Sequence, residues 1–292
     1  MASGGASPGS SAVTVARSAG YVPRTQSRWA GLVPNLIFYP IELLGGMTQL
    51  GGRVLASAVM RPVGYWRAVR DEMYFVLKTS WFPIVAAVFT FGIMVGIVGL
   101  NFTRPLGAGN RYGQYFFIVN IREFTPWINS MVVAGVIGAA ICSDLGARKI
   151  REELDALQVL GTDPVRELVL PRIVSITLLT PMLMVVSVII GMVCALISSV
   201  SYGGVPANEY LTLVYSNLTV VELVGAWLKS IMIGLVIGVV CAYKGLHCSG
   251  GAIGVGRAVN QAVVLSFVLV FLIDGVFNMI MLGLFPQLQI LR

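Results

Sequence analysis

The chain has 292 residues, 57% of them hydrophobic and 11% charged, with a formal net charge of +7. Soluble domains carry about 25% charged residues, and a mean hydropathy of +0.84 leaves a water-soluble fold nowhere to place so many apolar side chains. The composition therefore excludes an ordinary soluble protein and predicts an integral membrane protein. Because the basic residues cluster beside apolar segments, we assign the positive charge to lipid headgroups and topology, and expect no nucleic-acid partner.

The sequence offers little for metal or covalent chemistry. None of the four cysteines lies in a CxxC pair, and His247 is the single histidine, whereas zinc prefers four ligands. A zinc-dependent intramembrane enzyme is disfavoured, because its HExxH motif needs two histidines. We therefore predict no catalytic residue, no metal site and no cofactor-binding site in this chain.

The first 80 residues differ in character from the rest. Residues 1–30 are rich in Ser, Gly and Ala and lack a hydrophobic run, which predicts a disordered cytoplasmic tail without a signal peptide. Residues 32–60 are apolar but interrupted by prolines, glycines and Glu42, so a helix lying along the membrane surface fits them better than a span, which stays the alternative. Residues 63–78 carry five charges and predict a short amphipathic helix. We treat residues 31–80 as one interfacial region.

Five segments after residue 80 reach the roughly 20 apolar residues that a spanning helix needs. We place these spans at about residues 81–101, 125–145, 172–202, 222–243 and 258–285. Small residues four apart, such as Gly92/Gly96 and Gly234/Gly238, predict close packing between spans.

The Lys and Arg residues in the flanks predict the orientation of the spans. The loop between spans two and three contains five of them, whereas residues 203–222 contain none. We therefore expect a bacterial inner-membrane protein with a cytoplasmic N-terminus and a periplasmic C-terminus.

The loop between spans two and three predicts a short charged helix over residues 148–160. Ile150, Leu154 and Leu157 form one apolar stripe along it. Gly161 would end the helix, and Asp163 followed by Pro164 would begin the next one. Such a helix could dock into a groove on a soluble partner or rest on the membrane surface, and periodicity alone does not decide between them.

Two charged residues, Lys229 and Asp274, lie in the middle of predicted spans. A lone charge at the bilayer centre costs about 2.5–3.5 kcal/mol, which favours pairing. Counted from the cytoplasmic ends of their spans, the two depths differ by only about 3 Å, so a Lys229–Asp274 pair is reasonable. Arg122 and Glu123, at the entry to span two, could extend this network, which would either fix the helix register or respond to transport.

Several motifs follow one another along the chain: Arg122-Glu123 followed by Pro126, residues 142–148, the run from Glu153 to Arg166 that continues to Pro171-Arg172, Leu228-Lys229-Ser230, Ser249-Gly250-Gly251-Ala252, and Gly254-Val255-Gly256. Together they resemble the MlaE/YrbE permease family over roughly residues 38–285. Residues 142–148 and the Gly254-Val255-Gly256 stretch look most like the A-type YrbE permeases of actinobacterial Mce systems.

The resemblance implies a fold with an interfacial elbow helix, five transmembrane helices and a cytoplasmic coupling helix between spans two and three, with residues 81–292 as the permease domain. It implies a lipid substrate, two copies of a separate ATPase that binds ATP and Mg, periplasmic MCE-domain proteins, and a second YrbE-type permease in a heterodimer. The residues expected to couple to the ATPase are Arg148, Ile150, Glu152, Glu153, Leu154, Asp155, Leu157, Gly161, Asp163 and Pro164.

The residues themselves also favour an ATPase on another chain, because the sequence contains no GxxxxGK[ST] phosphate loop. Gly254-Val255-Gly256 is the nearest glycine-rich stretch, and we interpret it as a flexible turn. The alternative function is an ion-coupled secondary lipid carrier that uses Lys229 and Asp274 as a proton relay. The absence of an inverted repeat weighs against it. The sequence names neither the lipid nor the direction of transport.

Overall fold

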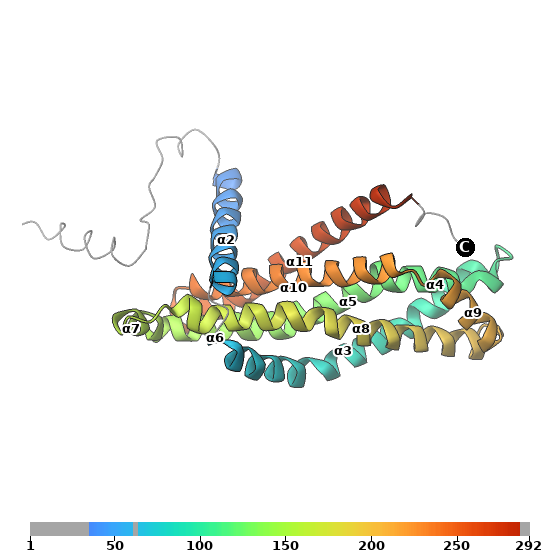
Figure 1. Ribbon diagram of the computed structural model, residues 1–292, viewed down its shortest axis with the longest axis horizontal. Helices are drawn as coiled ribbons and strands as arrows, with labels where there is room; N and C mark the ends of the chain where they lie inside the picture. Colours follow the sequence, from blue (N-terminus) through green and yellow to red (C-terminus); the bar gives the residue numbers. More distant parts are fainter. Residues whose placement is uncertain (1–34, 61–63, 287–292) are drawn as a thin grey trace, which may run out of the picture. The chain divides into compact units, whose positions relative to one another are not determined.

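The computed structural model describes residues 35–60 and 64–286, and within these ranges it consists of helices and short connections, without strands (Figure 1). The chain divides into two units, residues 1–48 and 49–292. Helix α2 (Asn35–Met60) crosses the boundary between them. The predicted tail, residues 1–30, lies outside the described residues, and whether α2 lies on or spans the membrane stays a prediction.

Among the described residues, five helical segments are long and apolar enough to cross a membrane, as the sequence predicted. The shorter elements are η1 (Gly109–Arg111), α7 (Glu153–Val159) and α9 (Ala207–Asn217). The five segments are α3 (Trp66–Thr103); the continuous run α4 (Tyr112–Val119), η2 (Asn120–Phe124), α5 (Thr125–Val132), η3 (Val133–Gly138) and α6 (Ala139–Ile150); η4 (Val165–Val169) with α8 (Leu170–Ser201); α10 (Val220–Leu246); and α11 (Gly251–Leu284).

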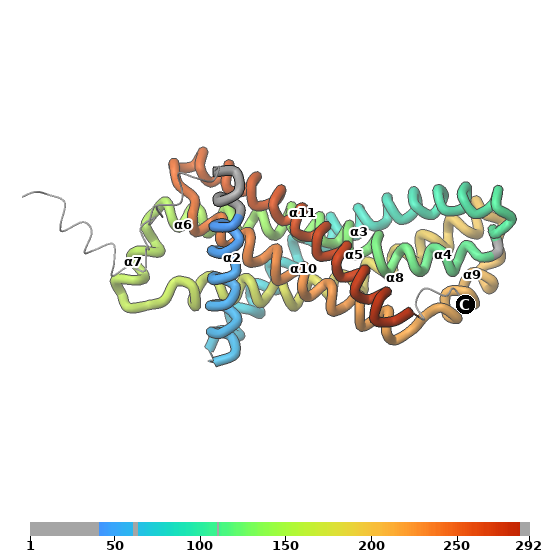
Figure 2. Tube along the Cα trace, turned by 90° about the horizontal axis from the view of Figure 1, so that it is seen from above, coloured from blue at the N-terminus to red at the C-terminus, as the bar shows by residue number. Residues whose placement is uncertain are grey.

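Helix α8 belongs to the third span. It packs against α3 and against α10, and α10 in turn packs against α6 and α11. Figure 2 shows these helices along their length, with α7 at one end of the bundle and α9 at the other. We refer to these as the α7 end and the α9 end.

The first span begins earlier than predicted. A separate amphipathic helix over residues 63–78 was the wrong expectation, because α3 runs without a break from Trp66 to Thr103. The polar residues at the expected junction fit inside the helix, since the hydroxyls of Thr79 and Ser80 donate to the carbonyls of Phe75 and Val76, at 2.8 and 2.7 Å.

The second span is also longer than predicted, because residues 112–124 are helical and not part of a loop. Their polar side chains, which the sequence analysis assigned to the loop, find partners inside the bundle. The Gln114 amide donates to Asn217 of α9 at 3.2 Å, and the Asn120 amide donates to the carbonyl of Val188 at 3.1 Å. Helix α9 itself was not predicted.

The expected turn at Gly254-Val255-Gly256 is wrong, since these residues lie inside α11, which begins at Gly251 instead of near residue 258. The chain turns just before it, where Gly250 and Gly251 adopt φ values of +93° and +68°. A Cβ at Gly254 would lie 1.9 Å from the carbonyl oxygen of Ser249, so the tight turn requires glycine there.

Small residues allow α8 to approach its neighbours. A Cβ at Gly92 of α3 would lie 3.0 Å from Cys194 Cβ, and one at Gly234 of α10 would lie 2.8 Å from Thr180 Oγ1. Within a bilayer, helices associate largely through such close packing, because apolar side chains gain nothing by leaving lipid.

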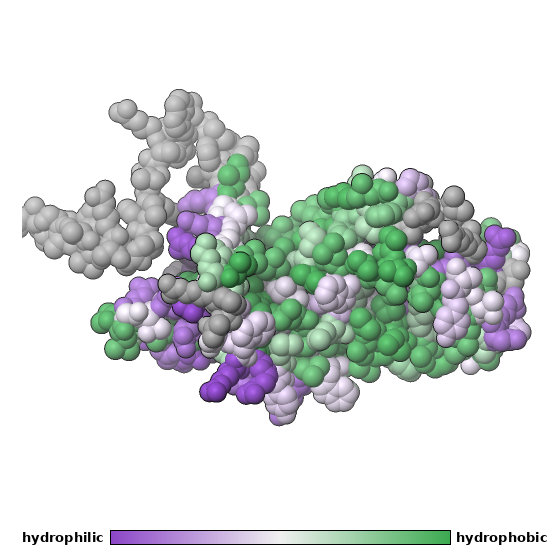
Figure 3. Space-filling view, viewed as in Figure 1, coloured by the Kyte–Doolittle hydropathy of each residue, from purple (hydrophilic) through white to green (hydrophobic). Residues whose placement is uncertain are grey.

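The outer surface of the bundle is apolar. Large side chains such as Phe89, Val193 and Phe271 are exposed along the spans. On the face drawn in Figure 3, hydrophobic residues cover the middle of the bundle, and hydrophilic residues gather near the α7 and α9 ends. This distribution fits a bundle surrounded by lipid.

Replacing Gly234 with Ala should destabilise the protein by about 1–3 kcal/mol, because the added methyl group would also lie 3.0 Å from the backbone oxygen of Ile176. Gly275→Ala is the matched control in α11, where a Cβ meets nothing within 4 Å. The apparent melting temperature of the purified protein in detergent tests this, and equal values for both variants would contradict it.

Candidate functional site

The intramembrane charges meet at Lys229 of α10, which is 1% exposed. Its Nζ lies 2.7 Å from Asp274 Oδ1 of α11, so the expected pair forms. The same Nζ donates to Asn278 Oδ1 at 3.1 Å and to the backbone carbonyl of Arg122. One ammonium group therefore connects the second, fourth and fifth spans.

The carbonyl of Arg122 is available for a local reason. In a regular helix it would accept from the N–H of residue 126, but residue 126 is proline and has no N–H. The chain forms the wider π-helical turn η2 just before this point, where the N–H of Thr125 donates to the carbonyl of Asn120. Lys229 supplies a donor to the Arg122 carbonyl from another helix.

The structure adds two residues that the sequence analysis missed. Glu222, in the first turn of α10, accepts from Arg122 Nε at 2.9 Å and forms an ion pair with the same guanidinium. Asn278 donates to Glu123 Oε1 at 2.6 Å, so Glu123 joins the network through an amide. Glu222 had been placed at a span boundary, and Asn278 carries no charge that would have marked it.

These residues line a cleft of about 240 Å³ between the second, fourth and fifth spans. Its other walls are apolar, with Ile121, Ala226 and Phe277 among them. The cations that face the cleft, Arg122 and Lys229, are each engaged by a carboxylate. The arrangement is therefore suited to fixing helix register beside an apolar space.

The predicted coupling helix differs from the observed one. Helix α6 continues to Ile150, so Arg148 and Ile150 belong to α6, and α7 begins only at Glu153. Between them Glu152 adopts a left-handed conformation, with φ of 59°, which breaks the expected single helix. Ile150 is therefore not part of the same stripe as Leu154, which is buried.

The end of α7 follows the sequence prediction closely. Gly161 has φ of +77°, and its N–H donates to the carbonyl of Gln158, while the N–H of Thr162 donates to that of Leu157. This is the Schellman arrangement that glycine favours at a helix C-terminus. Asp163 Oδ1 then accepts from the N–H of Val165 at 3.0 Å, with Pro164 in the first turn of the next helix.

The α7 tip, Val159 and Leu160, leaves two apolar side chains exposed. Their exposed fractions are 88% and 78%, whereas Leu154 at the other end of α7 is buried.

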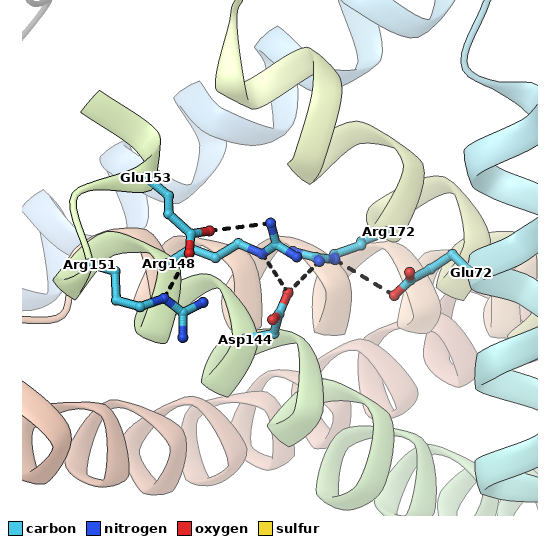
Figure 4. A network of polar contacts seen from close by, with 6 residues as sticks. All are labelled: Glu72, Asp144, Arg148, Arg151, Glu153 and Arg172. Carbon is cyan, nitrogen blue, oxygen red and sulfur yellow. Dashed lines mark hydrogen bonds and ion pairs between the residues drawn. The ribbon is translucent and has the colours of Figure 1, made fainter. Parts of the chain in front are cut away.

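A chain of ion pairs runs beside α7 (Figure 4). Arg148 of α6 lies 3.0 Å from Asp144 and 3.4 Å from Glu153 of α7, and Arg151 lies 2.7 Å from Glu153. Outside this chain, Lys149 pairs with Asp155 at 3.2 Å. The predicted acidic residues Glu153 and Asp155 of α7 thus face basic residues at the end of α6 and in the turn that follows it.

Within residues 35–60 and 64–286, no three His, Cys, Asp or Glu side chains lie together in a way that could hold a metal ion.

Replacing Lys229 with Met should cost about 3–5 kcal/mol, because the buried Asp274 loses its ion-pair partner. The double variant Lys229→Met/Asp274→Leu should recover much of this loss, since no unpaired charge then remains at that position. Unfolding free energies in mixed micelles measure both. A double variant less stable than Lys229→Met would contradict the account.

Comparison with known proteins agrees with this architecture. Residues 69–280 match the family described as permease MlaE. A probable ABC transporter permease protein of Rickettsia typhi is 27% identical over 228 residues, which cover 78% of this chain and 88% of the relative.

Two further relatives are more similar over shorter stretches. A probable ABC transporter permease protein of Synechocystis is 32% identical, over 62% of this chain and 71% of its own length. The chloroplastic protein TRIGALACTOSYLDIACYLGLYCEROL 1 of Arabidopsis thaliana is 34% identical, over 61% of this chain and 51% of its own length. The five-span bundle and these matches together show that this chain belongs to the MlaE permease family, as a permease subunit of the ABC transporter type.

Proposed function

We propose that this chain is the membrane-spanning subunit of a lipid transporter of the Mce type, driven by a separate ATPase that docks on the α7 tip. The observation that carries the proposal is the α7 tip itself, where Val159 and Leu160 are exposed on a helix held between two turns. Because the sequence contains no phosphate loop, the ATP and Mg sites would lie on the partner.

A lipid substrate is supported by two observations. The cleft beside the charge network has largely apolar walls and lies between spans. The Arabidopsis relative carries the name of a diacylglycerol lipid. We infer that the lipid passes between the inner membrane and periplasmic MCE-domain proteins.

The assembly we propose contains two copies of the ATPase and a second YrbE-type permease, with this chain as the A-type member of a heterodimer. The support is the resemblance of residues 142–148 to A-type permeases.

The ion-coupled carrier is the weaker alternative, because a proton relay needs a group that exchanges with water. Lys229 is buried and already engaged by Asp274, Asn278 and a backbone carbonyl. An ionophore removes the ion gradient. ATP-dependent lipid movement that persists in its presence would therefore favour the ABC permease over the ion-coupled carrier.

Val159→Asp should reduce the amount of ATPase co-purified with the complex by about tenfold, because a carboxylate would be buried in an apolar contact. Val220→Asp is the matched control, since Val220 is also exposed (75%) at a helix end but lies at the α9 end. Quantitative immunoblotting of complexes from native membranes measures the effect. Equal losses in both variants, or none in Val159→Asp, would refute docking at the α7 tip.

The proposed orientation places α7 in the cytoplasm and α9 in the periplasm. In a Cys248→Ser background, Tyr215→Cys on α9 should react with a membrane-impermeant maleimide on intact spheroplasts, because Tyr215 is exposed. Val159→Cys should react only after permeabilisation and removal of the ATPase, because the docked ATPase would cover the α7 tip. The reverse pattern of labelling would overturn the orientation.

A further inference from the structure

Asp144 and Arg172 stand at the two ends of the α6–α8 loop, the stretch that carries α7. Asp144 lies in α6 and Arg172 in the first turn of α8, 28 residues later in the sequence. The Arg172 guanidinium donates to Asp144 Oδ2 (Figure 4). This ion pair, which we call the clasp, closes the base of the loop and joins the second span directly to the third.

Arg172 also reaches the first span. Its Nε lies 3.7 Å from Glu72 Oε1 of α3, and its side chain is only 11% exposed. One largely buried guanidinium therefore contacts carboxylates from two other spans. Ion pairs are screened less by salt when they are partly buried, so this cation holds its neighbours more firmly than a surface arginine would.

The clasp is linked to α7 by a second step. Asp144 Oδ2 accepts from both Arg172 and Arg148 Nε, and Arg148 pairs with Glu153 in the first turn of α7. Acidic and basic groups alternate along this path from α3 to α7. A displacement of α7 therefore meets a continuous set of charge contacts that reaches three spans.

We propose that Asp144 and Arg172 are positioning residues that make the second and third spans move as one unit, together with α3, when the ATPase displaces α7. Without the clasp, the two ends of the α6–α8 loop are held to one another only indirectly, through the packing of α6 and α8 on α10. A force on α7 would then deform the loop before it moved the second and third spans. This inference rests on the proposed ATP-driven function.

A reversible crosslink separates positioning from simple stabilisation. In a Cys248→Ser background, the variant Asp144→Cys/Arg172→Cys is purified as the complete complex with its ATPase from native membranes. A short bis-methanethiosulfonate reagent then joins the two thiols, and dithiothreitol releases them. The Cys248 replacement is needed because that thiol lies beside the carbonyl of Gly146, close to Asp144 in the chain.

The measurement is the change in amide hydrogen exchange of α3 and α8 when a non-hydrolysable ATP analogue binds. In the Cys248→Ser complex the analogue should change exchange in both helices. Without the crosslink, this change in exchange should be about fivefold smaller, or less still, in the double-cysteine variant. The crosslink should restore it and dithiothreitol should abolish it again, in the same folded molecules.

Arg70→Gln is the control, because it removes an exposed ion pair with Asp71 on the same helix α3 and should leave the response unchanged. A full response in the uncrosslinked variant, or no recovery after crosslinking, would overturn the clasp while leaving the proposed function intact. A Cys248→Ser complex that lacks an ATPase, or shows no response to the analogue, would overturn both.

Discussion

The interior of a bilayer supplies no water, so charged groups among the spans must find their partners on other helices. Lys229 shows how this need for partners determines which helices pack together. Its ammonium group meets Asp274, Asn278 and the carbonyl of Arg122. Because Pro126 cannot donate to that carbonyl, the proline in the second span and the lysine in the fourth form one structural device. It holds three spans together beside the apolar cleft.

The charges at the α7 end are under a different constraint. Most are partly exposed, so water competes for them and each pair is worth only about 0–1 kcal/mol. Contacts of this strength can rearrange at little cost, whereas the pairs around Lys229 cannot. This division, firm within the membrane and adaptable at one end, fits the proposed function, in which a soluble ATPase drives the permease from that end. Arg172 is intermediate, because its own side chain is mostly buried whereas its partner Asp144 is partly exposed.

Features that depend on local sequence were predictable. Hydropathy located five spans, and Gly161, Asp163 and Pro164 marked the helix ends that the structure has. The errors arose where distant partners decide the conformation. Residues 112–124 resembled a loop because they carry polar side chains, and only the structure shows that α8, α9 and α10 supply partners for these side chains. Glu222 and Asn278 likewise acquired a role only through the packing of the helices. The break at Glu152 was not predictable either, because glutamate rarely adopts a positive φ.

Native mass spectrometry of the complex extracted from membranes tests the central claim, that a separate ATPase drives this permease. The account predicts one assembly that contains this chain, an ATP-binding subunit in equal number to the permease chains, and bound lipid. An intact assembly without any ATP-binding subunit would contradict it.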